Sequence, residues 1–452
     1  MQTRSFTRRH WMILCLFGLV GQIAWSVENM YFNLFLFDTV SPNLDAVTLM
    51  VQLSGIVATL TTLVAGTLSD RSGNRRTFLS LGYLIWGVTV GLFGFFEVDL
   101  FRKLFALSET RAISVTLIAI IVGDCVMTVF GSTANDAAFN AWVTDNTQSA
   151  YRGKVEGILS ILPLLAMLIV AGGFGILVEL VGYRALFLGL GVIITLCGLY
   201  GLRAVKDSPT LQKKGSFLDI LYGFRPSVIR SHPALYLTLC LVGIYGIACQ
   251  IFMPYLIIYM KTYLGFSVME YSVVFGLAIL LGAFVNLFLT SYADKVDKTR
   301  LLYLATLILS VGLLGMYLSR TDSKMFTLIL FGVSGFVMIT GYIFVSALCG
   351  ALVRDYTPSH SVGKLQGVRM IFSVLLPMIF GPMIGNAINK SVAAPLPDVS
   401  SADTMTTMYI PAPQIFFAGA GVALLMLVLI PLLGRVVKRS KGGTDGEIEN
   451  SL

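Results

Sequence analysis

Residues 141–157 read AWVTDNTQSAYRGKVEG, and residues 351–367 read ALVRDYTPSHSVGKLQG. Alanine, aspartate, threonine, glycine and lysine recur at a spacing of 210 positions, so that Asp145 corresponds to Asp355. Such self-similarity over a long, fixed spacing indicates an internal duplication. The chain is therefore predicted to consist of two copies of one unit.

A second and weaker echo runs at a spacing of 224 positions, and it pairs Tyr31 with Tyr255 and Asp70 with Asp294. The difference between the two spacings means that the first copy holds about 14 extra residues. We place this insertion in the 97–113 loop. Two parallel copies of a hydrophobic unit are a common construction of secondary transporters, in which the substrate site lies between the copies near mid-membrane.

The composition identifies an integral membrane protein, because 56% of the 452 residues are hydrophobic and only 12% are charged. A helix needs about 20 apolar residues to cross a bilayer. Barrel strands are shorter and alternate in polarity, which disfavours a β-barrel. Twelve apolar runs of helical length are predicted to span the membrane: 11–37, 46–69, 77–96, 114–141, 155–181, 186–204, 234–260, 270–293, 301–319, 326–352, 365–389 and 413–433.

The predicted fold is therefore all-α, with 12 transmembrane helices in two six-helix bundles. The N-terminal bundle is expected at 1–204 and the C-terminal bundle at 231–440. Residues 205–230 form a polar cytoplasmic linker, and residues 441–452 are expected to be a disordered tail.

The positions of the basic residues predict the orientation, because Lys and Arg are retained on the cytoplasmic side. With both termini in the cytoplasm, 24 of the 32 basic residues lie inside. Topology thus accounts for the net charge of +8, and a nucleic-acid partner has no separate support. We expect a multi-pass monomer in the plasma membrane, in contact with the lipid bilayer.

No cofactor, metal or enzymatic activity is predicted. All six cysteines fall inside apolar spans, and none has metal-ligand spacing. The chain has no phosphate-binding Gly-x-x-x-x-Gly-Lys loop, so ATP is not expected to drive it.

The loop after the second span contains Gly66, Asp70, Arg71, Gly73, Arg75 and Arg76. This pattern resembles the Gly-x-x-x-Asp-Arg-x-Gly-Arg-Arg signature of the major facilitator superfamily. A carboxylate here can face the positive end of a helix, and arginines can pair with a carboxylate at a neighbouring helix end. We expect Asp70 to lie against the helix start at 363–367, and Arg75 or Arg76 against Asp145. The alternative is that they are ordinary positive-inside charges. The predicted cytoplasmic gate comprises Asp70, Arg71, Arg75, Arg76, Asp145, Asp294 and Arg369.

Three carboxylates lie within predicted spans, where each is costly enough to indicate a function. Glu28 lies in the first span, and Asp124 and Asp136 lie in the fourth. A carboxylate that faces a cavity beside aromatic rings can load and release a proton during transport. The structural alternatives are a hydrogen bond to a neighbouring helix for Glu28 and an ion pair for Asp136.

Polar and aromatic residues near these carboxylates are predicted to bind the substrate. Asp124, Thr128 and Asn135 share one helix face. Plain packing is the alternative for the aromatic residues. The expected set is Trp25, Asn29, Tyr31, Asn33, Thr128, Asn135, Tyr245, Gln250 and Tyr255.

Residues 25–31, WSVENMY, resemble a stretch in the first helix of the animal sucrose-type proton symporters. Residues 141–145, AWVTD, with Arg152, resemble the end of the fourth helix in those proteins and in the glycoside–pentoside–hexuronide cation symporters. The resemblance implies proton-coupled import of a sugar or glycoside, with Glu28 as the proton carrier. The sodium-using members have two carboxylates in the second helix, where this chain has Ala58 and Thr62.

Two other functions remain open. Proton-driven efflux of drugs or other amphiphiles is the first, although the fifth span lacks the proline of the Gly-Pro-x-x-Gly motif common in antiporters. A receptor or scaffold that has lost transport is the second. The loop signature and the buried carboxylates argue against it.

Overall fold

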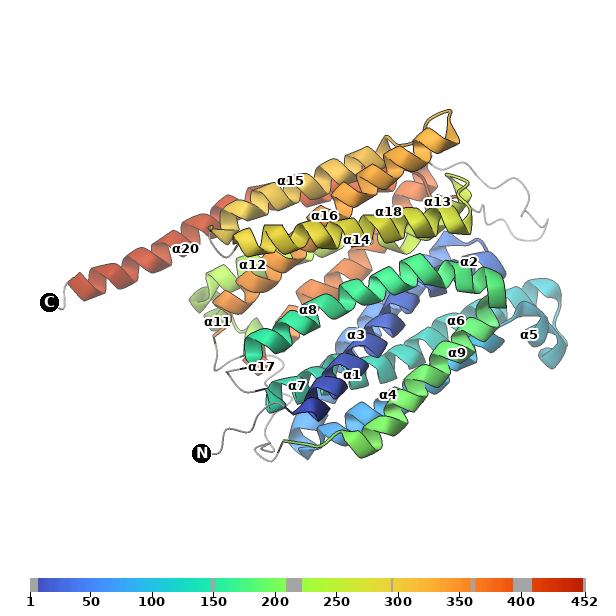
Figure 1. Ribbon diagram of the computed structural model, residues 1–452, viewed down its shortest axis with the longest axis horizontal. Coiled ribbons are helices and arrows are strands. Elements are labelled where there is room, and N and C mark those ends of the chain that lie inside the picture. The colour runs from blue at the N-terminus through green and yellow to red at the C-terminus, as the bar shows by residue number, and fades with distance from the viewer. Residues whose placement is uncertain are drawn as a thin grey trace. The chain divides into compact units, whose positions relative to one another are not determined.

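A computed structural model describes the protein at residues 7–147, 151–208, 222–293, 296–358, 362–392 and 409–449. Nearly all of these residues are helical, and the long helices run side by side within each part of the chain (Figure 1). Hydrocarbon offers no partner for backbone N–H and C=O groups, so a spanning segment has to bond them internally. The predicted all-α class is confirmed.

The first half of the chain contains four short segments labelled η, whose turns are wider or tighter than an α-turn, besides its α-helices. Its elements are α1 (Arg8–Val27), η1 (Glu28–Phe32), α2 (Asn33–Thr39), α3 (Leu44–Ser72), α4 (Arg75–Leu92), η2 (Phe93–Phe95), α5 (Val98–Phe105), α6 (Glu109–Gly131), η3 (Ser132–Phe139), α7 (Asn140–Asn146), α8 (Arg152–Ile169), η4 (Val170–Phe174) and α9 (Gly175–Ala204).

The second half has the same kind of helices. Its elements are η5 (Tyr222–Phe224), α11 (Pro226–Ser231), α12 (Pro233–Gln250), η6 (Met253–Tyr255), α13 (Leu256–Thr262), α14 (Val268–Ala293), α15 (Lys298–Tyr317), α16 (Lys324–Tyr356), α17 (Val362–Met370), η7 (Ile371–Leu375), α18 (Leu376–Val392), α19 (Gln414–Leu424) and α20 (Met426–Glu449).

Among the described residues, eleven continuous helical stretches are long and apolar enough to cross a membrane. The longest, Arg152–Ala204, has 53 residues and contains the two spans predicted at 155–181 and 186–204. Gly182 lies between them with φ 77° and ψ 164° and breaks the helix there. A residue with a side chain rarely adopts this backbone conformation, and glycine does so at little cost. The twelve predicted spans therefore all correspond to helices.

The chain forms two compact units. Unit 1 consists of residues 1–217, 253–276 and 393–410, and unit 2 of residues 218–252, 277–392 and 411–452. The division differs from the predicted bundle boundary in one notable respect. Residues 253–276 come from the second half of the sequence, yet they pack within unit 1.

Close approach of helices in unit 1 depends on glycine. A Cβ atom built at Gly87 of α4 would lie 2.4 Å from the backbone nitrogen of Thr195 in α9. In unit 2, a Cβ at Gly312 of α15 would lie 2.2 Å from the nitrogen of Met338 in α16. Small residues at such crossings allow backbones to touch, which is how helices associate where lipid removes the hydrophobic driving force.

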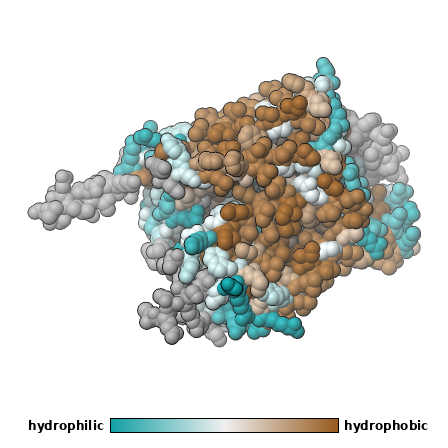
Figure 2. Space-filling view, in the orientation of Figure 1, coloured by the Kyte–Doolittle hydropathy of each residue, from teal (hydrophilic) through white to brown (hydrophobic). Residues whose placement is uncertain are grey.

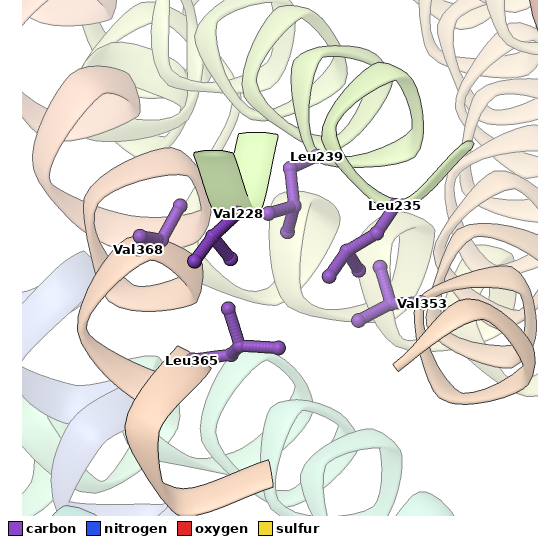
Figure 3. Packing of buried hydrophobic residues seen from close by; sticks show 6 residues of the cluster. All are labelled: Val228, Leu235, Leu239, Val353, Leu365 and Val368. Atoms are coloured by element: carbon purple, nitrogen blue, oxygen red, sulfur yellow. The ribbon is translucent and has the colours of Figure 1, made fainter. Parts of the chain in front are cut away.

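Unit 2 contains a small cluster of buried apolar side chains (Figure 3). It joins α11, α12, α16 and α17, four elements that are far apart in sequence. The cluster consists of Val228, Leu235, Leu239, Val353, Leu365 and Val368. Apolar side chains also cover the sides of the long helices, whereas polar residues gather toward their ends (Figure 2), as a bilayer requires.

Two segments, which the sequence predicts to be a polar linker and a disordered tail, contain helix in the structure. The linker at 205–230 contains the short elements η5 and α11, while residues 209–221 lie outside the described residues. Helix α20 continues to Glu449 and so includes residues that the sequence analysis assigns to a disordered tail. The chain has no proline between Pro431 and Glu449 to end that helix.

Candidate functional site

Several predicted site residues lie in π-helical segments inside membrane spans. Glu28 and Tyr31 belong to η1, and Asn135 and Asp136 belong to η3. A π-turn is wider than an α-turn and recurs at functional sites. Asparagine side chains in and next to these turns donate hydrogen bonds to backbone carbonyls. The Asn29 amide donates to the carbonyl of Trp25 at 2.8 Å.

The same bonding continues beyond each wide turn. The Asn33 amide donates to the carbonyl of Asn29 at 2.8 Å. In η3, the Asn140 amide donates to the carbonyls of Asn135 at 3.2 Å and Asp136 at 3.0 Å. Asn29 and Asn33, predicted to bind substrate, therefore each use an amide donor on the backbone. Asn29 is exposed, and the buried Asn33 keeps its Oδ1 without a hydrogen bond to the described residues.

Glu28 is buried at 6% exposure and takes part in a cluster with two hydroxyl groups. The Ser54 hydroxyl donates to Glu28 Oε1 at 2.7 Å. The Thr128 hydroxyl lies 3.2 Å from the same oxygen and 2.9 Å from Ser54 Oγ. Spans one, two and four thus meet at a single carboxylate oxygen.

Asp124 lies beside this cluster and is 1% exposed. It is close enough to Glu28 for their negative charges to repel, and Ser54 interacts with it as well. Glu28 Oε2 and Asp124 Oδ1 are buried and make no hydrogen bond to any residue that the structure describes. Two acceptor oxygens are therefore available for a proton or a donor from a bound molecule.

The predicted residue Asn135 is held by Tyr83, which the sequence analysis did not single out. The Tyr83 hydroxyl lies 2.6 Å from the Phe17 carbonyl and 3.0 Å from Asn135 Oδ1, and its single proton serves both acceptors. Tyr83 and Asn135 are both buried. The amide group of Asn135 is thus fixed in orientation by α4.

Two tryptophan rings lie one turn along from these residues. Trp25 and Trp86 have centroids 5.2 Å apart, and both indole nitrogens are buried without a hydrogen bond to the described residues. Gly131 makes room for them, because a Cβ there would lie 2.8 Å from Trp86 and 3.1 Å from Trp25. The half-buried Asp136 lies near Trp25 and Ser132. Unit 1 therefore holds a polar and aromatic cluster around three carboxylates.

Residues 253–276 contact the first half of the chain at a separate place within unit 1. The Tyr255 hydroxyl lies 2.7 Å from Thr48 Oγ1, which donates its own proton to the Leu44 carbonyl at 2.6 Å. Tyr255 is therefore the donor to Thr48. Lys261 Nζ pairs with Asp38 Oδ2 at 2.6 Å.

The remaining predicted substrate residues divide between the units. Tyr31 is fully buried in unit 1, with its ring centroid 5.9 Å from that of Phe174. Tyr245 in unit 2 is buried, and its hydroxyl donates to the Tyr342 carbonyl at 3.0 Å. Gln250 is half-buried in the same unit. Their joint use in one site remains a prediction.

Arg75 occupies the centre of the predicted gate and is only 5% exposed. Its Nε donates to Asp145 Oδ2 at 3.0 Å, and its Nη1 donates to Ser69 Oγ at 2.5 Å. A further nitrogen pairs with Asp70. The expected pairing of Arg75 with Asp145 is thus present, and Asp70 pairs with Arg75.

The turn within the loop signature determines where the Arg75 side chain lies. Gly73 ends α3 in the left-handed conformation at φ 63°, and Asn74 then caps α4 by accepting from the Thr77 amide at 2.9 Å. Glycine tolerates this φ without strain, and asparagine is a favoured cap. The chain therefore reverses within two residues and turns the Arg75 side chain back toward the carboxylates.

The other gate residues have varied positions. Arg76 is exposed and bonds the Leu202 carbonyl, while its own amide donates to Asp207 at 2.8 Å. Arg71 and Arg369 are exposed. Asp294 lies outside the described residues. In unit 2, Lys298 pairs with Asp355, the counterpart of Asp145, at 2.6 Å.

The duplicated helical units, the buried carboxylates and the charged loop turn define a multi-pass membrane protein of the secondary-transporter class. The sequence profile of the Major Facilitator Superfamily matches residues 13–382. The chain belongs to this family of transporters. A comparison with curated proteins finds no match.

Solved structures with the same fold include two of the nucleoside transporter NupG. An aspartate-to-alanine mutant of NupG has a TM-score of 0.68 at 10% identity, with 93% of this chain and 99% of that chain covered. A second structure of NupG has a TM-score of 0.63 at 12% identity, with 93% of this chain and 98% of that chain covered. A bacterial homolog of the human lysosomal transporter Spinster, inward-facing and unoccupied, has a TM-score of 0.62 at 15% identity, covering 94% and 95%. At these identities the likeness concerns the fold.

Proposed function

We propose that this transporter couples the uptake of a sugar or glycoside to protons by alternating access. Glu28 carries the proton, with Asp124 and Asp136 assisting. The observation that supports this most directly is the buried Glu28, whose Oε1 accepts from the Ser54 hydroxyl at 2.7 Å while its Oε2 is open to another partner.

The chemistry of the cluster suits a proton better than a permanent charge. Two neighbouring carboxylates that are cut off from water cannot both stay ionised at reasonable cost. A proton on Glu28 or Asp124 removes the repulsion, and the hydroxyls of Ser54 and Thr128 can follow it by rotating, since a hydroxyl both donates and accepts. A substrate hydroxyl that bonds the open oxygens would then link substrate binding to protonation.

The surrounding residues match a polyhydroxylated ligand with an apolar face. Trp25 and Trp86 offer rings against which such a face can pack, and Asn135 and Thr128 offer hydroxyl partners. The first-helix resemblance to the sucrose-type symporters points the same way. A nucleoside also combines a flat ring with hydroxyls, and the fold likeness to the nucleoside transporter NupG makes nucleosides a necessary comparison ligand.

The charged loops complete the proposal as a cytoplasmic gate. Arg75 holds Asp70 and Asp145 together, while Arg71, Arg76, Asp294 and Arg369 supply further charges. The transporter is proposed to work as a monomer in the plasma membrane with both termini in the cytoplasm.

The test starts with ligand identification. A thermal-shift screen of purified protein against sugars, glycosides, nucleosides and cationic amphiphiles reports binding, because a ligand stabilises the folded state with the logarithm of its concentration over Kd. Stabilisation by glycosides supports the proposal. Stabilisation by cationic amphiphiles alone would instead support drug efflux. Stabilisation by nucleosides alone would make nucleosides, and not sugars or glycosides, the proposed substrate class.

Proton coupling is then measured in proteoliposomes with the ligand so identified. Uptake that follows an inward pH gradient and acidifies a trapped pH dye supports symport. Glu28→Gln should abolish pH-driven uptake, and Glu109→Gln, an exposed carboxylate at the start of α6, should not. If Glu28→Gln is driven by the gradient as well as the parent is, Glu28 is not the carrier.

A further inference from the structure

The loop between α4 and α6 carries a short helix that the transport proposal does not use. Helix α5 covers Val98–Phe105, and none of its residues is buried. The second half has no such element between α15 and α16, which are separated only by residues 318–323. The helix therefore lies within the insertion that the sequence repeat predicts in the first copy.

The sequence of α5, VDLFRKLF, is strongly amphipathic. At 100° per residue, its apolar side chains occupy one half of the helix circumference. The polar residues Asp99, Arg102 and Lys103 occupy the opposite side, and Arg102 pairs with Asp99 at 3.1 Å. Such a pattern belongs either to a helix that packs against protein or to one that lies in a membrane interface.

The apolar face of α5 is only partly covered by the described part of the protein. Leu100 is 42% exposed, Leu104 69% and Phe105 55%. Phe101 is half-buried and contacts Phe96, with ring centroids 6.2 Å apart. One edge of the face thus anchors the helix to the protein, and the other edge is left open.

The position of α5 in the chain places this open edge at a membrane surface. The helix connects α4 and η2, the end of one membrane span, to α6, the start of the next. Figure 1 shows it at the end of α6, away from the N-terminus. Helices that lie in this zone bury apolar residues at the headgroup and acyl boundary and keep basic residues near the lipid phosphates.

A row of aromatic rings fixes how α5 is held. Phe101 contacts Phe96, Phe96 lies 5.1 Å from Phe93, and Phe93 stacks on Phe32 at 4.1 Å. Phe32 is the last residue of η1, four positions after Glu28. The orientation of α5 is therefore coupled by packing to the first span.

We propose that α5 is an in-plane interfacial helix whose partner is the lipid bilayer, on the side opposite the N-terminus. Leu100, Leu104 and Phe105 insert at the boundary between headgroups and acyl chains. Lys103 points toward the lipid headgroups and water. The membrane contact of α5 requires neither the proposed substrate nor the proposed proton carrier.

The test uses the full-length protein in liposomes that contain lipids brominated on the acyl chains, which quench nearby tryptophan. Leu104→Trp and Lys103→Trp each add one tryptophan to the native four, and the parent protein gives the baseline. The added emission of Leu104→Trp should be quenched by bromolipid at least about twofold more strongly than that of Lys103→Trp. Aqueous iodide should give the reverse order.

Equal quenching of the two variants by iodide would place α5 in water and overturn the proposal. So would an added tryptophan at position 104 that neither agent quenches, because protein would then cover the face. Bromolipid quenching that disappears as the protein-to-lipid ratio rises would assign the face to a second copy instead. Leu100→Trp repeats the measurement at a second apolar position should Leu104→Trp fail to fold.

Discussion

Arg75 donates through Nε to Asp145 Oδ2 at 3.0 Å, and the same guanidinium pairs with Asp70. One buried cation therefore serves two carboxylates whose side chains are 24% and 45% exposed. The planar fork of arginine allows it to bond several acceptors at once. The loop turn, the end of α3 and the end of α7 are joined at this single group.

Replacing Arg75 by alanine should destabilise unit 1. The change leaves the carboxylates of Asp70 and Asp145 without their cation. Both are partly exposed, so water compensates for part of the lost interaction. We expect a loss of about 2 kcal/mol in the free energy of unfolding, below the cost of a fully buried pair. Thermal unfolding in detergent measures it. Arg76→Ala, an exposed neighbour, should cost clearly less, and equal losses would contradict a special role for Arg75.

The corresponding pair in unit 2 should matter less. Lys298 pairs with Asp355 at 2.6 Å, but their side chains are 30% and 49% exposed. Ion pairs in contact with solvent contribute about 0–1 kcal/mol. Lys298→Ala should therefore lower the unfolding temperature less than Arg75→Ala does, and the effect of Lys298→Ala should shrink at high salt more than that of Arg75→Ala. A larger loss of unfolding temperature for Lys298→Ala would mean that the ion pair of the second copy contributes more to stability than that of the first.

Removing the Ser54 hydroxyl should shift the pH profile of uptake. Ser54 donates to Glu28 Oε1, and a donated hydrogen bond favours the ionised carboxylate over the protonated one. Ser54→Ala should make Glu28 hold its proton more tightly. The pH at half-maximal uptake should then rise by about one to two units, since a hydrogen bond to a charged group is worth about 1.5–3 kcal/mol and one unit is 1.36 kcal/mol.

The matched control for this measurement is Thr59→Ala. Thr59 lies on the same helix and is equally buried, but it donates to the Gly55 carbonyl at 2.9 Å, and within the described residues no hydrogen bond joins it to a carboxylate. Its pH profile should match that of the parent. A profile of Ser54→Ala that also matches the parent would show that Glu28 does not set the pH response.

Gly131→Ala should disturb the tryptophan pair. The added methyl group would lie 2.8 Å from Trp86 and 3.1 Å from Trp25, so the rings have to move. Overpacking of this kind costs about 1–3 kcal/mol, and ligand stabilisation in the thermal-shift assay should fall. Gly189→Ala in α9, where a Cβ meets nothing within 4 Å, serves as control. Unchanged ligand binding in Gly131→Ala would show that the two tryptophan rings do not belong to the substrate site.

The sequence predicts the spans and the charged turn well, because length, polarity and the Gly73 turn are local properties. It does not predict the wide turns at Glu28 and at Asn135, because an α-helix and a π-turn have the same hydropathy and differ only in how neighbouring helices and amides satisfy the backbone. Ser54 and Tyr83 are missed for a related reason. Neither belongs to a motif, and each gains its role from a partner on another helix.

The placement of residues 253–276 is equally hidden from a one-dimensional pattern. The repeat assigns this segment to the second copy, while its bonds from Tyr255 to Thr48 and from Lys261 to Asp38 tie it to the first. Such pairings are between residues more than 200 positions apart in the chain.

The wide turn at Glu28–Phe32 also holds about one residue more than an α-helical turn needs. Deleting one residue there would restore an ordinary turn, and the helix beyond it would keep nearly the same face toward its neighbours, so that Asp38 could still reach Lys261. A deletion in a regular helix rotates everything that follows by about 100°, whereas this position can absorb the loss of a single codon. Relatives that lack this residue should therefore need no compensating change in the segment that bears Lys261.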